Sequence, residues 1–114
     1  MTCLIWCKMT NEKRFSIFRN ARHKWSEIAQ AMVACEEMGE LITAVSQYYR
    51  GRDDADHVLE EIADVMLCCE QLIFNMAERH NCEYEDFETI VRETKQRKLE
   101  RMEMRLNEAK NNRS

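Results

Sequence analysis

Hydrophobic side chains recur at helical spacing along three stretches of this chain. Between Trp25 and Arg50, apolar positions follow one another every three or four residues. A second stretch, from Ala55 to Arg79, has a broad apolar face, and a third, from Tyr84 to Lys110, approaches coiled-coil spacing towards its end. Residues 1–22 combine a short apolar start with polar and basic positions, and we predict a short helix there. The pattern predicts an all-α fold.

The breaks between these stretches carry the signals of helix ends. Gly51 suits the left-handed position that follows a helix, and three aspartates after it are candidates to cap the next helix: Asp53, Asp54 and Asp56. Two long helices joined by so short a linker are expected to pack antiparallel. A polar break at residues 80–81 separates the third helix.

Length and composition support one helical domain. The chain has 114 residues, no proline and only two glycines, so little interrupts the helices. A protein of this size buries only about two-thirds of the surface that its unfolded form exposes. We therefore predict a single domain over residues 1–114, an antiparallel helical bundle with two long central helices that is completed by oligomerisation.

The charge distribution bears on possible partners. Residues 1–91 carry nine basic and 17 acidic side chains, whereas residues 92–114 carry eight basic and four acidic ones. The acidic body argues against a nucleic-acid-binding domain, and a nucleotide fits better than a polymer. Recognition of DNA by the basic tail is disfavoured by the acids interspersed in it, Glu93, Glu100, Glu103 and Glu108.

Cysteine spacing and hydropathy indicate a cytoplasmic protein. The six cysteines form neither a paired CxxC zinc pattern nor a secreted disulfide framework, and we expect them to be reduced and mostly buried; they are Cys3, Cys7, Cys35, Cys68, Cys69 and Cys82. The first nine residues lack the regions of a signal peptide, and no segment is long enough to cross a bilayer. No membrane partner is expected.

Two short acidic patterns carry the candidate chemistry. Glu37 and Glu40 on the first long helix, and Glu61 and Asp64 on the second, are each spaced i and i+3. At roughly 60° apart around the helix, the two acids of a pair point to one side. Apolar or small residues flank them, namely Val33, Leu41, Ala44, Val65 and Cys68. These acids therefore lie in or beside the apolar stripes.

Carboxylates gathered in such a place need a positive partner, because like charges and desolvation both oppose their ionisation. Ligation by oxygen alone suits Mg²⁺ or Mn²⁺ better than zinc, and one of the acids could also orient a water molecule. The opposing interpretation is that such spacings arise by chance on charged helices, since this chain also carries Glu36, Glu60 and Glu70.

Residues 25–101 resemble the MazG-like nucleoside triphosphate pyrophosphohydrolases. The resemblance rests on Trp25, Gln30, the segment Glu36–Leu41, Arg50-Gly51, the segment Glu60–Val65 and Gln71-Leu72. It implies that Glu37, Glu40, Glu61 and Asp64 bind magnesium and that the enzyme hydrolyses an NTP or dNTP to the monophosphate and pyrophosphate. Such an activity serves control of the nucleotide pool or removal of damaged nucleotides.

The same resemblance implies further site residues and an assembly. Basic residues on the helix after the second motif, Lys95, Lys98 and Arg101, are expected to contact phosphates. Trp25 and Gln30 are expected to line the pocket for base and sugar, although Trp25 could equally be a core aromatic. Family members are homodimers or homotetramers, which fits a chain with a small core.

A second class of function stays open from the sequence. The chain could be a non-catalytic interaction module whose third helix mediates assembly, with the acids as solvated surface. Arg50 and Arg52 rank below the tail cations as phosphate ligands. The three histidines, His23, His57 and His80, are each interpreted as isolated surface or helix-end residues.

Overall fold

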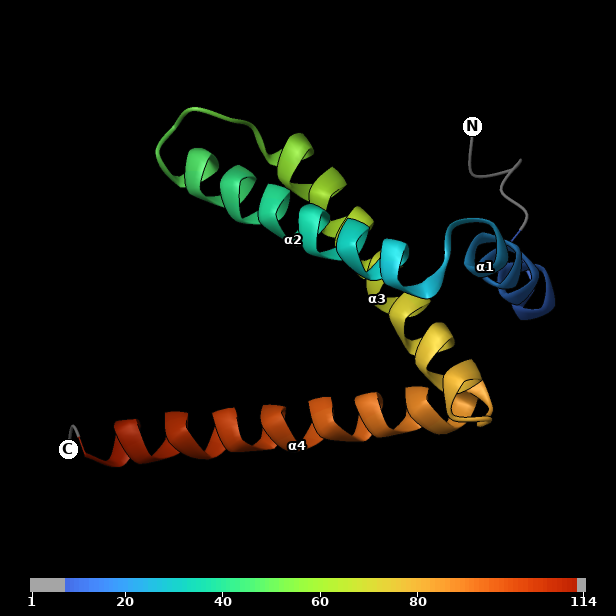
Figure 1. Cartoon of the computed structure of the whole chain (residues 1–114). Coiled ribbons are helices and arrows are strands. Elements are labelled where there is room, and N and C mark those ends of the chain that lie inside the picture. Colours follow the sequence, from blue (N-terminus) through green and yellow to red (C-terminus); the bar gives the residue numbers. More distant parts are fainter. Residues whose placement is uncertain (1–7, 113–114) are drawn as a thin grey trace. The chain divides into compact units, whose positions relative to one another are not determined.

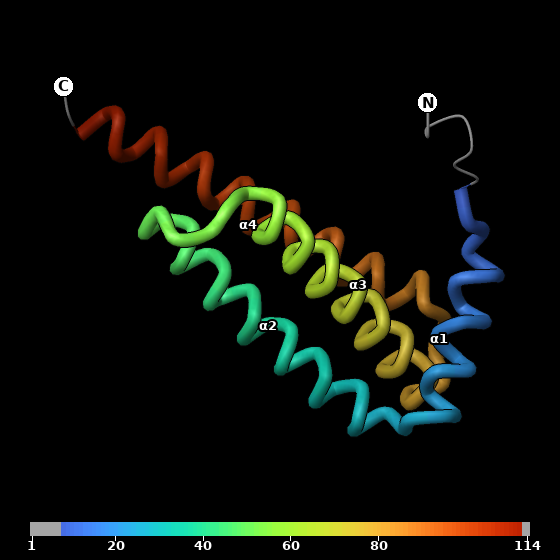
Figure 2. Tube along the Cα trace, turned by 90° about the horizontal axis from the view of Figure 1, so that it is seen from above, coloured from blue at the N-terminus to red at the C-terminus, as the bar shows by residue number. Residues whose placement is uncertain are grey.

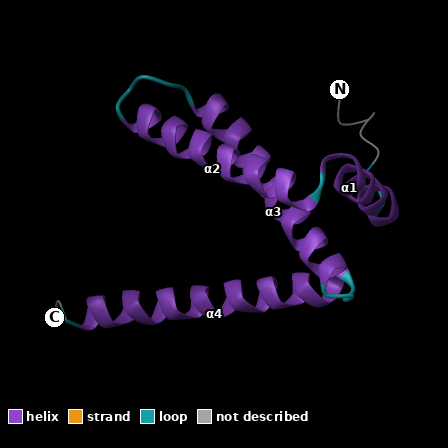
Figure 3. Cartoon of the chain, viewed as in Figure 1, coloured by secondary structure: helices purple, strands orange, loops and turns teal. Residues whose placement is uncertain are grey.

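The computed structural model describes residues 8–112 and contains four α-helices in that range. They are α1 (Asn11–Trp25), α2 (Glu27–Tyr49), α3 (Ala55–Arg79) and α4 (Tyr84–Asn111) (Figure 1). The described residues include no strand, as Figure 3 shows, so the all-α prediction is confirmed. The chain divides into two compact units, the first ending at Met76 and the second beginning at Ala77.

The junction of α1 and α2 lies at Ser26. The Ser26 hydroxyl accepts a hydrogen bond of 3.2 Å from the Ala29 amide and so caps α2. Its φ of 76° and ψ of 157° lie outside helical space. Trp25 therefore ends α1. The periodicity predicted that it would begin the next helix, and this boundary is wrong. The apolar spacing continues across the break, so a cap that a single serine provides is easily missed.

The turn between α2 and α3 follows the predicted chemistry. Gly51 has a φ of 73°, and the Arg52 amide donates to the Gln47 carbonyl at 2.8 Å, the long bond of a Schellman motif. The Asp54 carboxylate then accepts from the His57 amide at 2.9 Å and caps α3. Both the left-handed glycine and the aspartate cap are confirmed.

Helices α2 and α3 lie side by side in both views (Figures 1 and 2). Gln30, near the start of α2, is hydrogen-bonded to Asn75, near the end of α3. The only fully buried side chains of α2 are Ala34 and Ala44. Small side chains on this face allow the two backbones to approach, which brings the acids of the two helices within reach of one another.

Helix α1 is anchored on the second half of α3 by aromatic side chains. The rings of Phe15 and Phe18 each lie 5.7 Å from the ring of Phe74, and Arg14 forms an ion pair with Glu70. Phe18 and Phe74 are buried. Because α1 leads directly into Ser26, this anchor also holds the start of α2.

Both long helices leave apolar side chains in solvent. We define the outer stripe as a set of exposed apolar residues: Ile28, Met32, Ile42 and Tyr49 on α2, and Leu59, Ile62, Met66 and Met76 on α3. Successive members are three, four, seven or ten residues apart, which places them on one side of each helix. Ile42 is 71% exposed and Tyr49 is 81% exposed. The core is as small as the chain length predicted. None of the described helices combines the length and the hydropathy needed to span a membrane.

The second unit contains the last turn of α3 and the whole of α4. Asn81, with a φ of 56°, takes the left-handed place that glycine takes after α2, and the Cys82 amide donates to the Ala77 carbonyl at 2.9 Å. The rings of His80 and Phe87 lie 5.8 Å apart. The predicted polar break is therefore a second Schellman turn.

The cysteines differ from the expectation. The four described ones are free, but Cys35, Cys69 and Cys82 are exposed and only Cys68 is buried. The expectation of mostly buried thiols is wrong for these residues, because Cys35 and Cys69 lie on exposed sides of α2 and α3 and Cys82 lies in the turn after α3. Cys3 and Cys7 lie outside the described residues.

Candidate metal centre and adjoining pockets

Three of the four predicted acids converge between α2 and α3. Glu37, Glu61 and Asp64 each offer a carboxylate oxygen, and these oxygens all lie within 4.8 Å of one another. Glu61 and Asp64 are one turn apart on α3, so they share a face, and Glu37 approaches that face from α2. The i, i+3 spacing thus produces the two-helix cluster that it predicted.

The cluster contains buried oxygens without hydrogen-bond partners. Glu61 is only 9% exposed, and its Oε2 atom is buried and unpartnered, as is Oε2 of Glu37. A buried unpaired acceptor costs about 1–3 kcal/mol, and more when it is charged. Three converging carboxylates, two of them with an orphaned oxygen, fit a hard divalent cation, which prefers such donors.

Glu37 has an unfavourable electrostatic environment for an ionised carboxylate. Burial raises the pKa of Glu37, and the neighbouring charges of Glu40, Asp64 and Glu61 raise it further, together with a hydrogen bond to the Glu40 side chain. Protonation relieves the repulsion when no cation is bound. A bound divalent ion would relieve the same repulsion while leaving the acids ionised.

Glu40, the fourth predicted acid, lies at the rim of the cluster. It is exposed and is not among the three acids with closely spaced oxygens. Its side chain touches Glu37 through the hydrogen bond that contributes to the raised pKa of Glu37. The structure therefore brings all four acids into one region, with three at the centre and Glu40 beside them.

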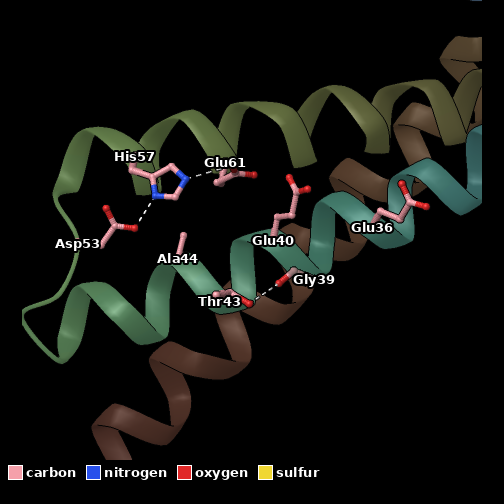
Figure 4. A pocket seen from close by; sticks show the side chains of 8 residues that line it. All are labelled: Glu36, Gly39, Glu40, Thr43, Ala44, Asp53, His57 and Glu61. Atoms are coloured by element: carbon pink, nitrogen blue, oxygen red, sulfur yellow. Dashed lines mark hydrogen bonds and ion pairs between the residues drawn. The ribbon is translucent and has the colours of Figure 1, made fainter.

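A pocket of about 580 Å³ opens next to the acids. In Figure 4, Glu40 extends from α2 and Glu61 lies opposite it on α3. The lining residues are Glu36, Gly39, Glu40, Thr43, Ala44, Asp53, His57 and Glu61. Most of the polar groups in this lining are carboxylates, so an anionic substrate would need a cation between itself and the wall.

His57 is the residue that sequence reasoning missed. Its Nδ1 atom pairs with Oδ2 of Asp53, and its Nε2 atom lies 3.4 Å from Oε1 of Glu61 (Figure 4). The hydrogen bond to Asp53 is the main cause that raises the pKa of His57, and the same bond lowers the pKa of Asp53. The interpretation of His57 as isolated is wrong. The signal was its spacing, four residues from an acid on each side.

A second, more apolar pocket lies further towards the start of α2. It has a volume of about 360 Å³ and is lined by Trp25, Ala29, Gln30, Val33 and Gln71. Trp25 is 58% exposed, so it is not a core aromatic. The two predicted base-pocket residues, Trp25 and Gln30, therefore lie together at one cavity.

Gln30 is engaged within the protein as well. Its Oε1 atom accepts a hydrogen bond of 2.7 Å from Nδ2 of Asn75, a side chain that is only 1% exposed. The second possible bond of this amide pair is missing, since Nε2 of Gln30 and Oδ1 of Asn75 are buried without partners. Sequence reasoning did not single out Asn75.

The predicted phosphate-binding cations lie on α4. Lys95, Lys98 and Arg101 are all exposed, and they belong to the second unit of the chain. Their role stays a prediction. Arg50 and Arg52 are exposed at the end of α2.

Comparisons with known proteins identified no similar protein. A scan against protein-family models, a search of curated proteins and a search of solved structures each returned no match.

Proposed function

We propose that this protein is a magnesium-dependent pyrophosphohydrolase that converts an NTP or dNTP to the monophosphate and pyrophosphate. The observation that carries the proposal is the cluster of Glu37, Glu61 and Asp64, with its two buried and unpartnered carboxylate oxygens. The burial of Glu61 and the unpartnered oxygens of Glu37 and Glu61 distinguish this cluster from acids that are fully solvated on a charged helix.

The acids would share the work at such a site. Glu37, Glu61 and Asp64 hold the cation, with Mn²⁺ able to replace Mg²⁺, and Glu40 at the rim orients water or completes the ligand set. When bound, the cation neutralises the triphosphate and favours ionisation of the attacking water. The protein's own contribution is to hold the four carboxylates on two rigid helices.

The apolar pocket suits the nucleoside part of the substrate. Gln30 and Glu37 are seven residues apart on α2, a separation of about 10 Å along the helix. This distance matches the scale of a nucleoside monophosphate, with its base near Trp25 and its phosphate at the acids. Lys95, Lys98 and Arg101 are the proposed contacts to the remaining phosphates, on the strength of the resemblance to the MazG-like family.

The assembly is part of the proposal. Helices α2 and α3 would form an antiparallel pair, and the outer stripe of one copy would pack against a second copy to complete the bundle as a homodimer or homotetramer. The exposed apolar side chains Ile42, Tyr49 and Met66 support this arrangement, because an interface with a second copy would remove them from water.

Pyrophosphate release from a panel of canonical and modified NTPs and dNTPs tests the activity. With Mg²⁺ the wild-type protein should release pyrophosphate, and EDTA should abolish the release. Glu61→Gln should lower kcat by at least about 100-fold, the scale of a lost transition-state contact. Glu60→Gln, on the exposed side of the same helix, is the matched control and should keep activity. Wild-type turnover in Glu61→Gln would refute the proposal.

The second candidate is a non-catalytic assembly module, which the outer stripe alone would also explain. The two candidates differ in their response to ligands. A metal enzyme gains stability of RT ln(1 + [L]/Kd) from a ligand that binds only the folded state. A raised melting temperature with Mg²⁺ plus nucleotide supports the enzyme, whereas an unchanged one together with no pyrophosphate release supports the module.

A further inference from the structure

His57 occupies a defined place between the turn and the acids. Its ring spans two carboxylates, with Nδ1 paired to Asp53 and Nε2 at 3.4 Å from Oε1 of Glu61. Asp53 belongs to the turn after α2, and its own Oδ1 atom accepts from the Asp54 amide at 2.8 Å. The imidazole is thus oriented by a residue that the turn itself fixes.

The two oxygens of Glu61 have different surroundings. Oε1 faces the His57 ring, whereas Oε2 is buried and has no hydrogen-bond partner. A carboxylate held at one oxygen has little freedom to rotate, so its other oxygen keeps one direction. Glu61 is also the most buried member of the cluster that includes Glu37 and Asp64.

We propose that His57, anchored by Asp53, is a positioning residue that holds Oε1 of Glu61 and thereby leaves Oε2 of Glu61 as the ligand oxygen of the metal centre. This inference rests on the proposed function, because it assumes that a divalent cation binds at the acids. The surroundings of ligand side chains commonly set metal affinity in this way, and their loss costs about 10- to 100-fold.

Orientation and charge make opposite predictions at this position. If His57 acted mainly through positive charge, its removal would strengthen cation binding at the neighbouring acids. If it orients Glu61, its removal weakens cation binding. Asp53 offsets the charge of the His57 ring. The orienting contact is therefore expected to decide whether removal of His57 raises or lowers the affinity for the cation.

Calorimetric titration of the metal-free protein with Mn²⁺ tests the inference without reference to activity. His57→Ala should weaken Mn²⁺ binding by about 10- to 100-fold. His57→Gln, which keeps a side-chain N–H donor four residues before Glu61, should restore affinity to within a few-fold of the wild type. Asp53→Asn should fall between the wild type and His57→Ala. Melting temperatures in EDTA establish that each variant is folded.

The matched control is Asp56→Asn, which removes one negative charge from the first turn of α3 without touching His57 and should leave Mn²⁺ affinity unchanged. Unchanged or tighter binding by His57→Ala would overturn the inference, as would equal effects of His57→Ala and His57→Gln. If the wild-type protein itself binds no Mn²⁺, the proposed metal centre fails and the role of His57 fails with it. Tight wild-type binding that is indifferent to His57 removes the positioning role alone.

Discussion

Individual side chains in this protein make incomplete or repulsive interactions. The acids of the cluster repel one another, and the amide pair of Gln30 and Asn75 makes one of its two possible hydrogen bonds. Buried polar groups in such a state reduce the free energy of unfolding. Two substitution experiments measure the effect at this scale.

The amide pair is suited to a double-mutant cycle. Asn75→Leu alone should lower the free energy of unfolding by about 1–3 kcal/mol, because it leaves Oε1 of Gln30 buried and unpaired. The double variant Gln30→Met/Asn75→Leu replaces both partners by apolar side chains of similar size and should recover most of that loss. Urea denaturation of the four proteins measures the coupling. Additive effects would contradict the pairing seen between the two amides.

Glu37 predicts a pH dependence for the metal-free protein. Its pKa is raised above the ordinary value of 4.5. At pH values between the unfolded-state and the folded-state pKa, Glu37 is therefore protonated in the folded protein and ionised in the unfolded one. The contribution of Glu37 to stability is therefore favourable at low pH and is lost as the pH rises above 4.5.

Glu37→Gln removes this pH dependence and should stabilise the protein near neutral pH in EDTA, with an advantage that disappears at low pH. Urea denaturation between pH 4 and pH 8 measures it, and Glu36→Gln, on the exposed side of the same turn, is the matched control. An advantage of Glu37→Gln that grew as the pH fell would contradict the assigned direction.

At the scale of helices, the ends were predictable because they depend on neighbouring residues. The aspartate cap of α3, the glycine after α2 and the polar break before α4 follow from the conformational preferences of those residue types. The one misplaced boundary, at Trp25 and Ser26, lies where the apolar period continues through a helix break. A serine cap without a glycine or proline nearby is a weak signal.

The two glycines form a matched pair for testing helix propensity against turn geometry. Gly51 has a φ of 73°, so Gly51→Ala places a side chain in the left-handed region and should cost about 1 kcal/mol. Gly39 lies inside α2, and a methyl group there would meet nothing within 4 Å beyond the adjoining backbone of α2 itself, so Gly39→Ala should stabilise by about 0.5–1 kcal/mol. Urea denaturation at low protein concentration measures both. Effects of the same sign would contradict the assignment of Gly51 to the turn.

At the scale of the whole molecule, the small core and the outer stripe have one cause, because apolar side chains that the core does not bury stay exposed on the helices. The four helices of residues 8–112 bury few large side chains, and the buried aromatic ones are Phe18 and Phe74. The exposed residues of α2 and α3 recur at the same spacing as buried ones do in helical bundles. A stripe of this kind is expected to pack against an apolar surface of a partner.

Self-association through the outer stripe predicts a melting temperature that rises with protein concentration. Ile42→Glu places a charge in the middle of the stripe on α2 and should shift the protein towards the monomer by at least about 10-fold in dissociation constant, since burying an unpaired charge costs several kcal/mol. Analytical ultracentrifugation measures the shift. Ile17→Glu changes an exposed side chain of α1 outside the stripe and is the control. A monomeric wild type at all concentrations would contradict the proposed assembly.

The local interactions of the sequence by themselves determined the helices, most of their ends and the face on which each acidic pair lies. Those features depend on residues within one or two turns of each other, and a 3.6-residue period records them directly. The four acids Glu37, Glu40, Glu61 and Asp64 could be selected for the same reason.

Only the tertiary structure decided which of these residues meet. The rotation and register of α2 against α3 place Glu37 against Glu61 and Asp64 and leave Glu40 at the rim. Periodicity leaves these two variables open, because they are set by packing across the interface between the helices, where alanines such as Ala34 and Ala44 lie buried.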